Sequence, residues 1–256
     1  MSSTVLLHSG LWAHASGALW IPESKTVVVA DIHLGYSWAQ RRRGELGPLA
    51  DERSREKLLR LREELNPRRF VFLGDLVHAP KPCAPERQWI EDVLRELGRS
   101  AELIAVLGNH DRAFADEFAY LPVETALFWN EASWTAIHGD QLGLPIPERR
   151  TLILGHLHPA LPVLDASGAG RKLPAFLASR PCIVLPAFSP FAGGYNLACG
   201  VPRELQALFQ GEEPETLVVT GTRVAQLGRL PRLLERMFAA DTSSPKRFRR
   251  AKAAPL

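Results

Sequence analysis

The sequence predicts an α/β fold in which a layered, largely parallel sheet is followed by a second, more antiparallel sheet. In the first half, short apolar runs rich in β-branched residues alternate with segments of helical period. Clusters of polar residues directly follow several of these apolar runs. In the second half the apolar runs continue, while clear helical patterns become fewer.

The N-terminal region begins with two or three strands and continues into a helix. The runs 5–7 and 18–21 flank a turn region that contains Gly and Ser, and the run 25–30 is rich in Val. A polar, basic stretch follows. Leucines then recur at helical spacing and predict a helix over residues 50–65, which the dipeptide Asn66-Pro67 ends.

Further strands and a helix complete the first half. A buried strand is expected over 70–73, followed by a Pro-rich loop over 79–85 and a helix over 86–97 that Gly98 closes. The apolar run 103–107 predicts the next strand. This alternation of strand and helix favours parallel pairing within one sheet.

The second half supplies strands with fewer helices between them. Two strands are expected over 133–137 and 151–154. Three later runs, 182–185, 217–220 and 224–227, are interpreted as antiparallel strands of the second sheet.

Composition indicates one large domain with a short basic extension. The chain has 256 residues, 46% of them hydrophobic, which suffices for a substantial core. We expect a single domain over 1–241 and a disordered tail over 242–256, where five basic residues lie between 246 and 252. The tail either contacts phosphates or acts only as a solubilising segment.

The sequence also indicates a cytoplasmic protein. No apolar run approaches the roughly 18 residues of a membrane-spanning helix, and the first ten residues lack the basic and apolar regions of a secretory signal. The cysteines Cys83, Cys182 and Cys199 are odd in number and have no metal-binding spacing. A reducing compartment is therefore expected.

Polar clusters follow the predicted strands at the edge where α/β sheets bind ligands. Each cluster alone could be an ordinary turn, but five in succession indicate one shared site. Imidazoles, carboxylates and an amide oxygen, without thiolates, suit Mn, Fe or Zn. They outnumber the ligands of one ion, so we expect a centre with two metals. The clusters are Asp31/His33, Asp75/His78, Asn109/His110, His138 and His156/His158.

The ordered motifs DxH, GDxxH, GNHD, HGD and GHxH between residues 31 and 158 resemble those of the calcineurin-like metallophosphoesterase superfamily. The resemblance implies a four-layer αββα sandwich, with two mixed β-sheets flanked by helices. It also implies two divalent ions, with Mn²⁺ expected and Zn²⁺ or Fe²⁺ as alternatives. By resemblance, one ion is held by Asp31, His33 and His158, the other by Asn109, His138 and His156, and Asp75 bridges both.

The resemblance assigns catalytic roles as well. A hydroxide bridging the two metals attacks phosphorus, and His110 stabilises or protonates the departing oxygen, a task suited to imidazole near neutral pH. Protein phosphatases of the family have an aspartate at the position of His78. A histidine there, followed by a Pro-rich loop, is more similar to the double-strand-break repair nucleases of the family. Alternatively, His78 only packs or has a supporting role. For Asp111 we expect a supporting hydrogen bond.

The segments 30–35, 73–78 and 185–196 resemble the bacterial ligase-associated DNA-damage-response phosphoesterases more closely. This resemblance implies a DNA nuclease in repair, acting on single-stranded or nicked DNA beside a DNA ligase and a helicase. The segment 185–196 has no assigned role; Gly193-Gly194 is expected to make a tight turn near the site, or only to pack.

Basic residues near the expected metals suit a polyanionic substrate. A phosphate-binding rim is predicted from two loops, although charge runs are also common as plain solvated surface. Tyr36 or Trp38 could stack on bases, or belong to the core. The rim residues are Arg41, Arg42, Arg43 and Lys81.

Two alternative functions stay open. One is a phosphodiesterase or pyrophosphatase acting on small nucleotides. The other is a nucleic-acid-binding accessory protein with vestigial catalysis, which is disfavoured because no expected ligand position is substituted.

Overall fold

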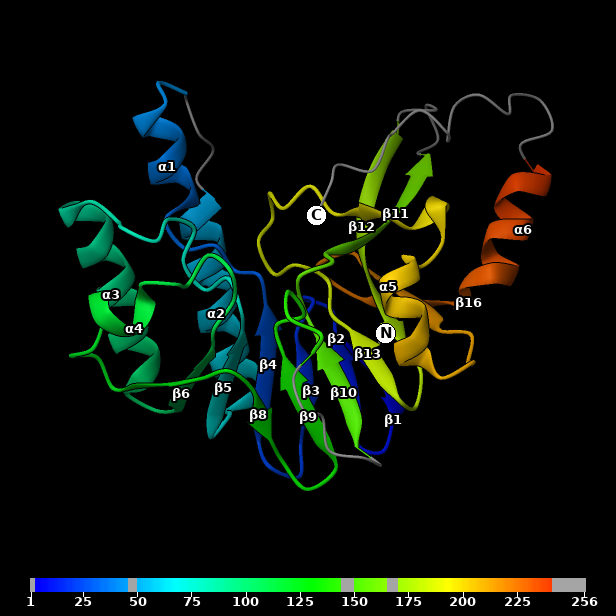
Figure 1. Ribbon diagram of the computed structural model, residues 1–256, viewed down its shortest axis with the longest axis horizontal. Helices are drawn as coiled ribbons and strands as arrows, with labels where there is room; N and C mark the ends of the chain where they lie inside the picture. The colour runs from blue at the N-terminus through cyan, green and yellow to red at the C-terminus, as the bar shows by residue number, and fades with distance from the viewer. Residues whose placement is uncertain (1–2, 46–49, 144–149, 165–169, 241–256) are drawn as a thin grey trace.

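The computed structural model describes residues 3–45, 50–143, 150–164 and 170–240. Two β-sheets face each other in the middle of the molecule, and helices cover the outer side of each sheet (Figure 1). The predicted basic tail, 242–256, lies outside the described residues. Within the described residues, no helix combines the length and the apolar character needed to cross a bilayer.

Among the described residues, the first sheet has seven strands in chain order. Its first four strands pair antiparallel, and the pairs from the fourth to the seventh are parallel. The register aligns Ala30, Leu73 and Val106, so three parallel strands end at one edge. The strands are β1 (Thr4–His8), β2 (Leu11–His14), β3 (Leu19–Ile21), β4 (Thr26–Ala30), β5 (Arg69–Leu73), β6 (Glu102–Val106) and β7 (Val123–Ala126).

In the described part of the chain, the second sheet has nine strands, seven of them on the path β14-β11-β12-β13-β10-β9-β8. Its register aligns Ile137, Leu154 and Val184 at the ends of three parallel strands. The path comprises β14 (Tyr195–Asn196), β11 (Pro159–Leu164), β12 (Gly170–Ala178), β13 (Cys182–Val184), β10 (Thr151–Leu154), β9 (Trp134–Ile137) and β8 (Trp129–Asn130). The hairpin of β15 (Glu215–Val219) and β16 (Val224–Arg229) pairs with β12.

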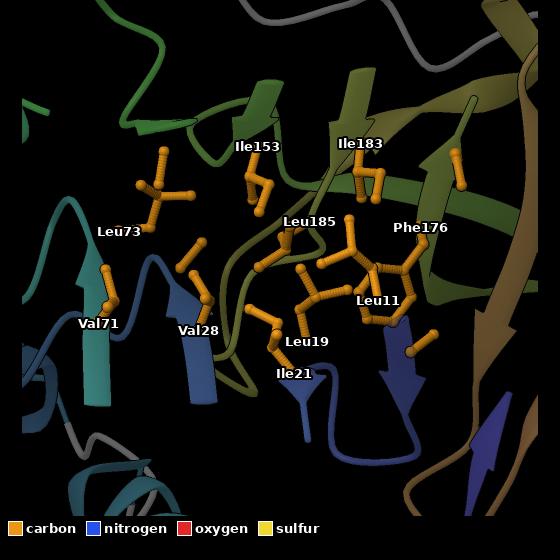
Figure 2. Close-up of a cluster of buried hydrophobic side chains, with 14 of the residues drawn as sticks. Leu11, Leu19, Ile21, Val28, Val71, Leu73, Ile153, Phe176, Ile183 and Leu185 are labelled. Atoms are coloured by element: carbon orange, nitrogen blue, oxygen red, sulfur yellow. The ribbon is translucent and has the colours of Figure 1, made fainter. Parts of the chain in front are cut away.

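Three apolar layers hold the fold together. Side chains of both sheets meet between them, with Val28 and Val71 on one side and Ile153 and Phe176 on the other (Figure 2). The outer face of the first sheet packs on α2 (Ala50–Leu65) and α3 (Ala84–Gly98). The outer face of the second packs on α5 (Arg203–Gln206) and α6 (Leu230–Ala240). The predicted four-layer αββα sandwich is confirmed.

Two local predictions are wrong. Strand β13 was expected to be antiparallel, yet it pairs parallel with β10 and antiparallel only with β12. The basic stretch expected as a loop forms helix α1 (Tyr36–Arg42), which places Arg41 and Arg42 in its last turn. The carboxylate of Asp51 accepts the Gly35 and Ser37 amides at 3.0 Å each, so a distant residue stabilises the start of α1.

A short helix, α4 (Phe114–Glu117), follows β6.

Candidate metal centre

The predicted ligand residues come together at the carboxyl ends of the parallel strands of both sheets. Asp31 follows β4, Asp75 follows β5, and Asn109 comes three residues after β6. His138 follows β9, and His156 comes two residues after β10. Their ligand atoms form groups close enough to share an ion: Asp31 with His33 and His158, Asp75 with His138 and His156, and His33 with His78 and His110.

Many of these residues have a backbone conformation that is uncommon outside glycine. The φ angles are 55° at Asp31, 52° at His33, 48° at Asp75, 62° at His156 and 50° at His158. A left-handed residue with a side chain costs roughly 1–2 kcal/mol. Such strain persists where the surroundings enforce it, and it is concentrated at functional sites. These sharp turns aim the side chains back over the ends of the strands.

One group of ligand atoms surrounds Asp31. His158 Nε2 lies 3.0 Å from Asp31 Oδ1, and the His33 and His158 rings lie 5.8 Å apart. Asp31 is fully buried, and its carboxylate also accepts the His156 amide at 3.0 Å. A proton on His158 can hold this pair together, and a divalent ion would compete for the same lone pairs.

The second group is centred on His138. Its Nδ1 lies 3.2 Å from the carbonyl oxygen of Leu73, which can only accept, so Nδ1 carries the proton and Nε2 presents a lone pair. This Nε2 lies 3.3 Å from Asn109 Oδ1, 3.2 Å from His156 Nδ1 and 3.6 Å from Asp75 Oδ1. Several lone pairs therefore converge on one point, an arrangement that a cation stabilises.

Asp75 lies between the two groups. Its Oδ1 faces His138, as above, while its Oδ2 lies 3.8 Å from His33 Nε2. One carboxylate thus directs an oxygen towards each group, which fits the expected bridging position. Asp75 is 3% exposed, so its charge needs a partner within the protein.

The electrostatics of the centre call for positive charge. Burial raises the pKa of Asp31, but His158, His138 and His33 together outweigh this effect and lower it below its usual value. Burial, opposed by Asp31, lowers the pKa of His33 to about 3, so this imidazole is neutral and available as a ligand. Among the described residues, the carboxylates of Asp31 and Asp75 lie within 3.8 Å of histidine nitrogens and form no ion pair with Lys or Arg. The donor set fits two divalent ions.

Three glycines of the motifs permit this close packing, a role that the sequence did not reveal. A Cβ on Gly74 would overlap the ring of His138. A Cβ on Gly108 would lie 2.5 Å from Asp75 Oδ1, and one on Gly155 would lie 2.9 Å from Leu73 O. Their position directly before ligand residues is the signal that could have identified them.

Asp111 joins the two loops that carry Asp75 and Asn109. Its carboxylate accepts the Gly108 amide at 3.0 Å, the Leu76 amide at 3.2 Å and the Val77 amide at 3.1 Å. Burial, partly opposed by these hydrogen bonds, raises the pKa of Asp111 to about 6. The expected supporting hydrogen bond is present, and it spans both loops.

His110 and His78 lie beside the two groups. His110 Nδ1 lies 2.8 Å from the carbonyl oxygen of His78 and must donate to it, which leaves Nε2 free to exchange a proton. The His110 ring lies 5.0 Å from the ring of His33 and 5.6 Å from that of His78. Burial lowers the pKa of His78 to about 4, with His110 adding to the effect, so His78 is neutral.

The predicted rim residues are all exposed, but they differ in their partners. Arg42 forms a 3.0 Å ion pair with the buried Glu86, so part of its charge is already neutralised. Arg41 lies over the ring of Trp38, 5.5 Å from its centroid. Arg43 and Lys81 form no ion pair within the described residues.

Of the two aromatic candidates for base stacking, Tyr36 lies beside the site. Its ring lies 5.1 Å from that of His78 and runs parallel to that of Phe191 at 6.1 Å. Its hydroxyl accepts a hydrogen bond from Gln40 at 2.7 Å, and the ring is only partly buried. The aromatic neighbour Phe191 was not identified from the sequence.

Comparison with known proteins establishes the class. Residues 24–179 match the family model described as calcineurin-like phosphoesterase, so the chain belongs to that family. The resemblance drawn from the motifs is confirmed, and the chain is a metal-dependent phosphoesterase. A comparison with curated protein sequences finds no match.

Two solved structures illustrate the similarity. The Pseudomonas putida nuclease MPE shares 25% identity, with a TM-score of 0.65 over 87% of this chain and 98% of that one. Yfce, a phosphoesterase from E. coli, shares 17% identity, with a TM-score of 0.39 over 80% of this chain and 98% of that one.

Proposed function

We propose that this protein is a two-metal phosphodiester hydrolase that cleaves DNA and acts in DNA repair. The observation that carries the proposal is the arrangement of two of the three groups of ligand atoms around one carboxylate, that of Asp75, with the third group, which contains His110, beside them. Two adjacent cations with a proton-exchanging imidazole suit the displacement of an alkoxide from a phosphodiester.

Each metal has a proposed set of ligands. Asp31, His33 and His158 hold one ion, Asp75 is shared, and Asn109, His138 and His156 hold the other. When bound, two divalent ions supply the Lewis acidity that activates water and neutralises charge on phosphate oxygens. We expect Mn²⁺ there, with Zn²⁺ or Fe²⁺ as alternatives that the same donors accept.

His110 is proposed to deliver the proton to the leaving oxygen. The carbonyl oxygen of His78 holds Nδ1–H and so fixes the orientation of the ring. Nε2 is then the nitrogen that takes up a proton and donates it as the phosphorus–oxygen bond breaks. His78 supports this function through its carbonyl group and through the 5.6 Å contact between the two rings.

Two features support DNA as the substrate. Arg43, whose charge acts on His78, and the exposed Lys81, three residues after His78 in the chain, are proposed to provide positive charge for phosphates beside the one that is cleaved. The parallel rings of Tyr36 and Phe191 provide an aromatic surface next to the same histidine, suited to an unpaired base. The similarity to a nuclease points the same way. Association with a DNA ligase and a helicase, and a cytoplasmic location, stay predictions.

The test is a cleavage assay on circular single-stranded and end-labelled nicked DNA with Mn²⁺. The wild-type protein should cut these substrates, and chelation should stop the reaction. His110→Asn keeps a donor for His78 O but loses Nε2, so kcat should fall roughly 10²- to 10⁴-fold. His8→Ala, on β1, serves as the histidine control.

Other outcomes separate the alternatives. Hydrolysis of bis(p-nitrophenyl) phosphate without cleavage of any nucleic acid would refute the DNA assignment and keep the enzyme class. Turnover confined to small nucleotides would favour the phosphodiesterase or pyrophosphatase. DNA binding without hydrolysis, unaffected by His110→Asn and lost on truncation at Asp241, would favour the accessory protein.

A further inference from the structure

The segment 185–194, here called the strap, joins β13 to β14 and passes beside the metal centre. It contains most of the motif 185–196, to which the sequence assigned no role. Within the strap, Ala187 forms an isolated parallel bridge with Ala30, the last residue of β4. The strap therefore touches the strand that delivers Asp31.

Backbone hydrogen bonds connect this segment to two ligand residues. At its start, the Phe188 amide donates to Ala30 O at 2.8 Å and the Ser189 amide donates to Asp31 O at 3.1 Å. Directly after its end, the Tyr195 amide donates to His158 O at 2.8 Å. Asp31 follows β4 of the first sheet and His158 precedes β11 of the second, so these bonds connect the two sheets at the metal centre.

These bonds act on two strained residues. Asp31 and His158 have φ angles of 55° and 50°, which the chain adopts only when neighbours enforce them. A hydrogen bond to the carbonyl group of each residue restrains the peptide that follows it, and with it the direction of the side chain. Both restrained residues belong to one pair, in which His158 Nε2 lies 3.0 Å from Asp31 Oδ1.

The strap is itself held by two lysines. Lys57 on α2 donates to Phe188 O at 2.7 Å, and its Nζ lies 3.8 Å from the centroid of the Phe188 ring. Lys172 on β12 donates to the carbonyl oxygens of Gly193 and Gly194 at 3.2 and 2.9 Å. Gly194 has φ +64°, and a Cβ there would lie 2.7 Å from Ala160 Cβ, so the strap packs tightly against β11.

We propose that the strap is a positioning element that sets the affinity of one metal site, that of Asp31, His33 and His158, and leaves the other largely unaffected. In the described part of the chain, backbone hydrogen bonds from the strap and from Tyr195, the residue that follows it, reach Asp31 and His158, and none reaches Asn109, His138 or His156. The inference rests on the ligand sets of the proposed function. Lys57 and Lys172 act through the strap and touch neither metal nor substrate.

The experiment measures Mn²⁺ binding to the full, chelator-treated chain, with free Mn²⁺ followed by its electron paramagnetic resonance signal. The double variant Lys57→Met/Lys172→Met removes the donors while keeping the apolar stems. It should weaken one of two sites by roughly 10- to 100-fold, the usual effect of losing a group that orients a ligand. Lys57→Arg, with Lys172 unchanged, keeps a donor at position 57 and should keep the wild-type affinity, and Arg60→Met, one turn along α2, should behave as wild type.

Two ligand variants identify the weakened site. His158→Ala should remove the strap-dependent site, so adding the double lysine change should cause little further loss. His156→Ala should remove the other site and leave the remaining one sensitive to that change. Equal weakening of both sites, no weakening, or a wild-type chain that binds no Mn²⁺ would overturn the proposal. Thermal unfolding of each variant shows whether a loss reflects misfolding; if Lys57→Met/Lys172→Met misfolds, the single lysine variants decide.

Metal binding and DNA cleavage together distinguish failure of the strap proposal from failure of the proposed function. If the protein binds two Mn²⁺ ions with the predicted selectivity but cuts no DNA, the strap proposal stands and the DNA assignment fails. If the protein cuts DNA while both sites weaken together, the strap proposal fails alone.

Discussion

Replacing Gly74 by alanine tests the close approach between the loop after β5 and the ring of His138. A Cβ at this position would overlap three atoms of that side chain, Nδ1, Cγ and Cβ, so His138 cannot keep its place. Gly74 also has φ +73°, which costs an alanine roughly 1–2 kcal/mol. Overpacking adds roughly 1–3 kcal/mol.

Gly10 provides a matched control for the backbone. It has φ +77°, and a Cβ added there would have no neighbouring atom within 4 Å, so Gly10→Ala carries the same conformational strain without the clash. The two variants should therefore differ by the packing contribution, about 1–3 kcal/mol in the free energy of unfolding. Gly74→Ala should also lose the metal site that contains His138.

The assay is urea unfolding of the metal-free proteins, together with Mn²⁺ titration of separate, folded portions of the same preparations. Gly10→Ala should keep the metal binding of the wild type. Equal stability of the two variants, together with two intact metal sites in Gly74→Ala, would show that the tight contact with His138 is absent.

Three further predictions concern charge and metal. Burial lowers the pKa of Lys57 from its usual 10.5 to about 7, so between these values the unfolded chain binds more protons and stability rises with pH. In Lys57→Met the rise of the urea midpoint above pH 7 should be shallower; an unchanged slope contradicts this. Arg43→Ala and Lys81→Ala should each weaken DNA binding at all sequences and reduce the salt dependence of log K by about 1; binding that keeps the wild-type salt slope argues against the rim. Saturating Mn²⁺ at 100 times its Kd should stabilise the wild type by about 2.7 kcal/mol per site, whereas Asp75→Asn, lacking the shared carboxylate, should gain far less.

Much of the fold could be predicted because its elements have strong local signals. The Val-rich run of β4 and the leucines of α2 have the right period and clear ends, and parallel pairing follows from their alternation. Polar residues such as Asp31 and Asn109 follow buried strands in the sequence. This position alone predicts that they lie at the same edge of the sheet. Local pattern therefore determined which residues could meet, since parallel strands end together.

The remaining features depend on distant contacts that carry no local signal. Helix α1 starts where Asp51, far along the chain, accepts the Gly35 and Ser37 amides. The direction of β13 follows from its place between β10 and β12, which an apolar run of three residues cannot specify. The strap likewise has a role only because Lys57 and Lys172 approach it from other elements.

The most direct test is an anomalous difference map from crystals grown with Mn²⁺. We expect two peaks: one within ligand distance of Asp31, His33 and His158, and one near Asn109, His138 and His156, with Asp75 between them. A single peak, no peak, or manganese bound to other side chains would contradict a two-metal centre at the ends of these strands.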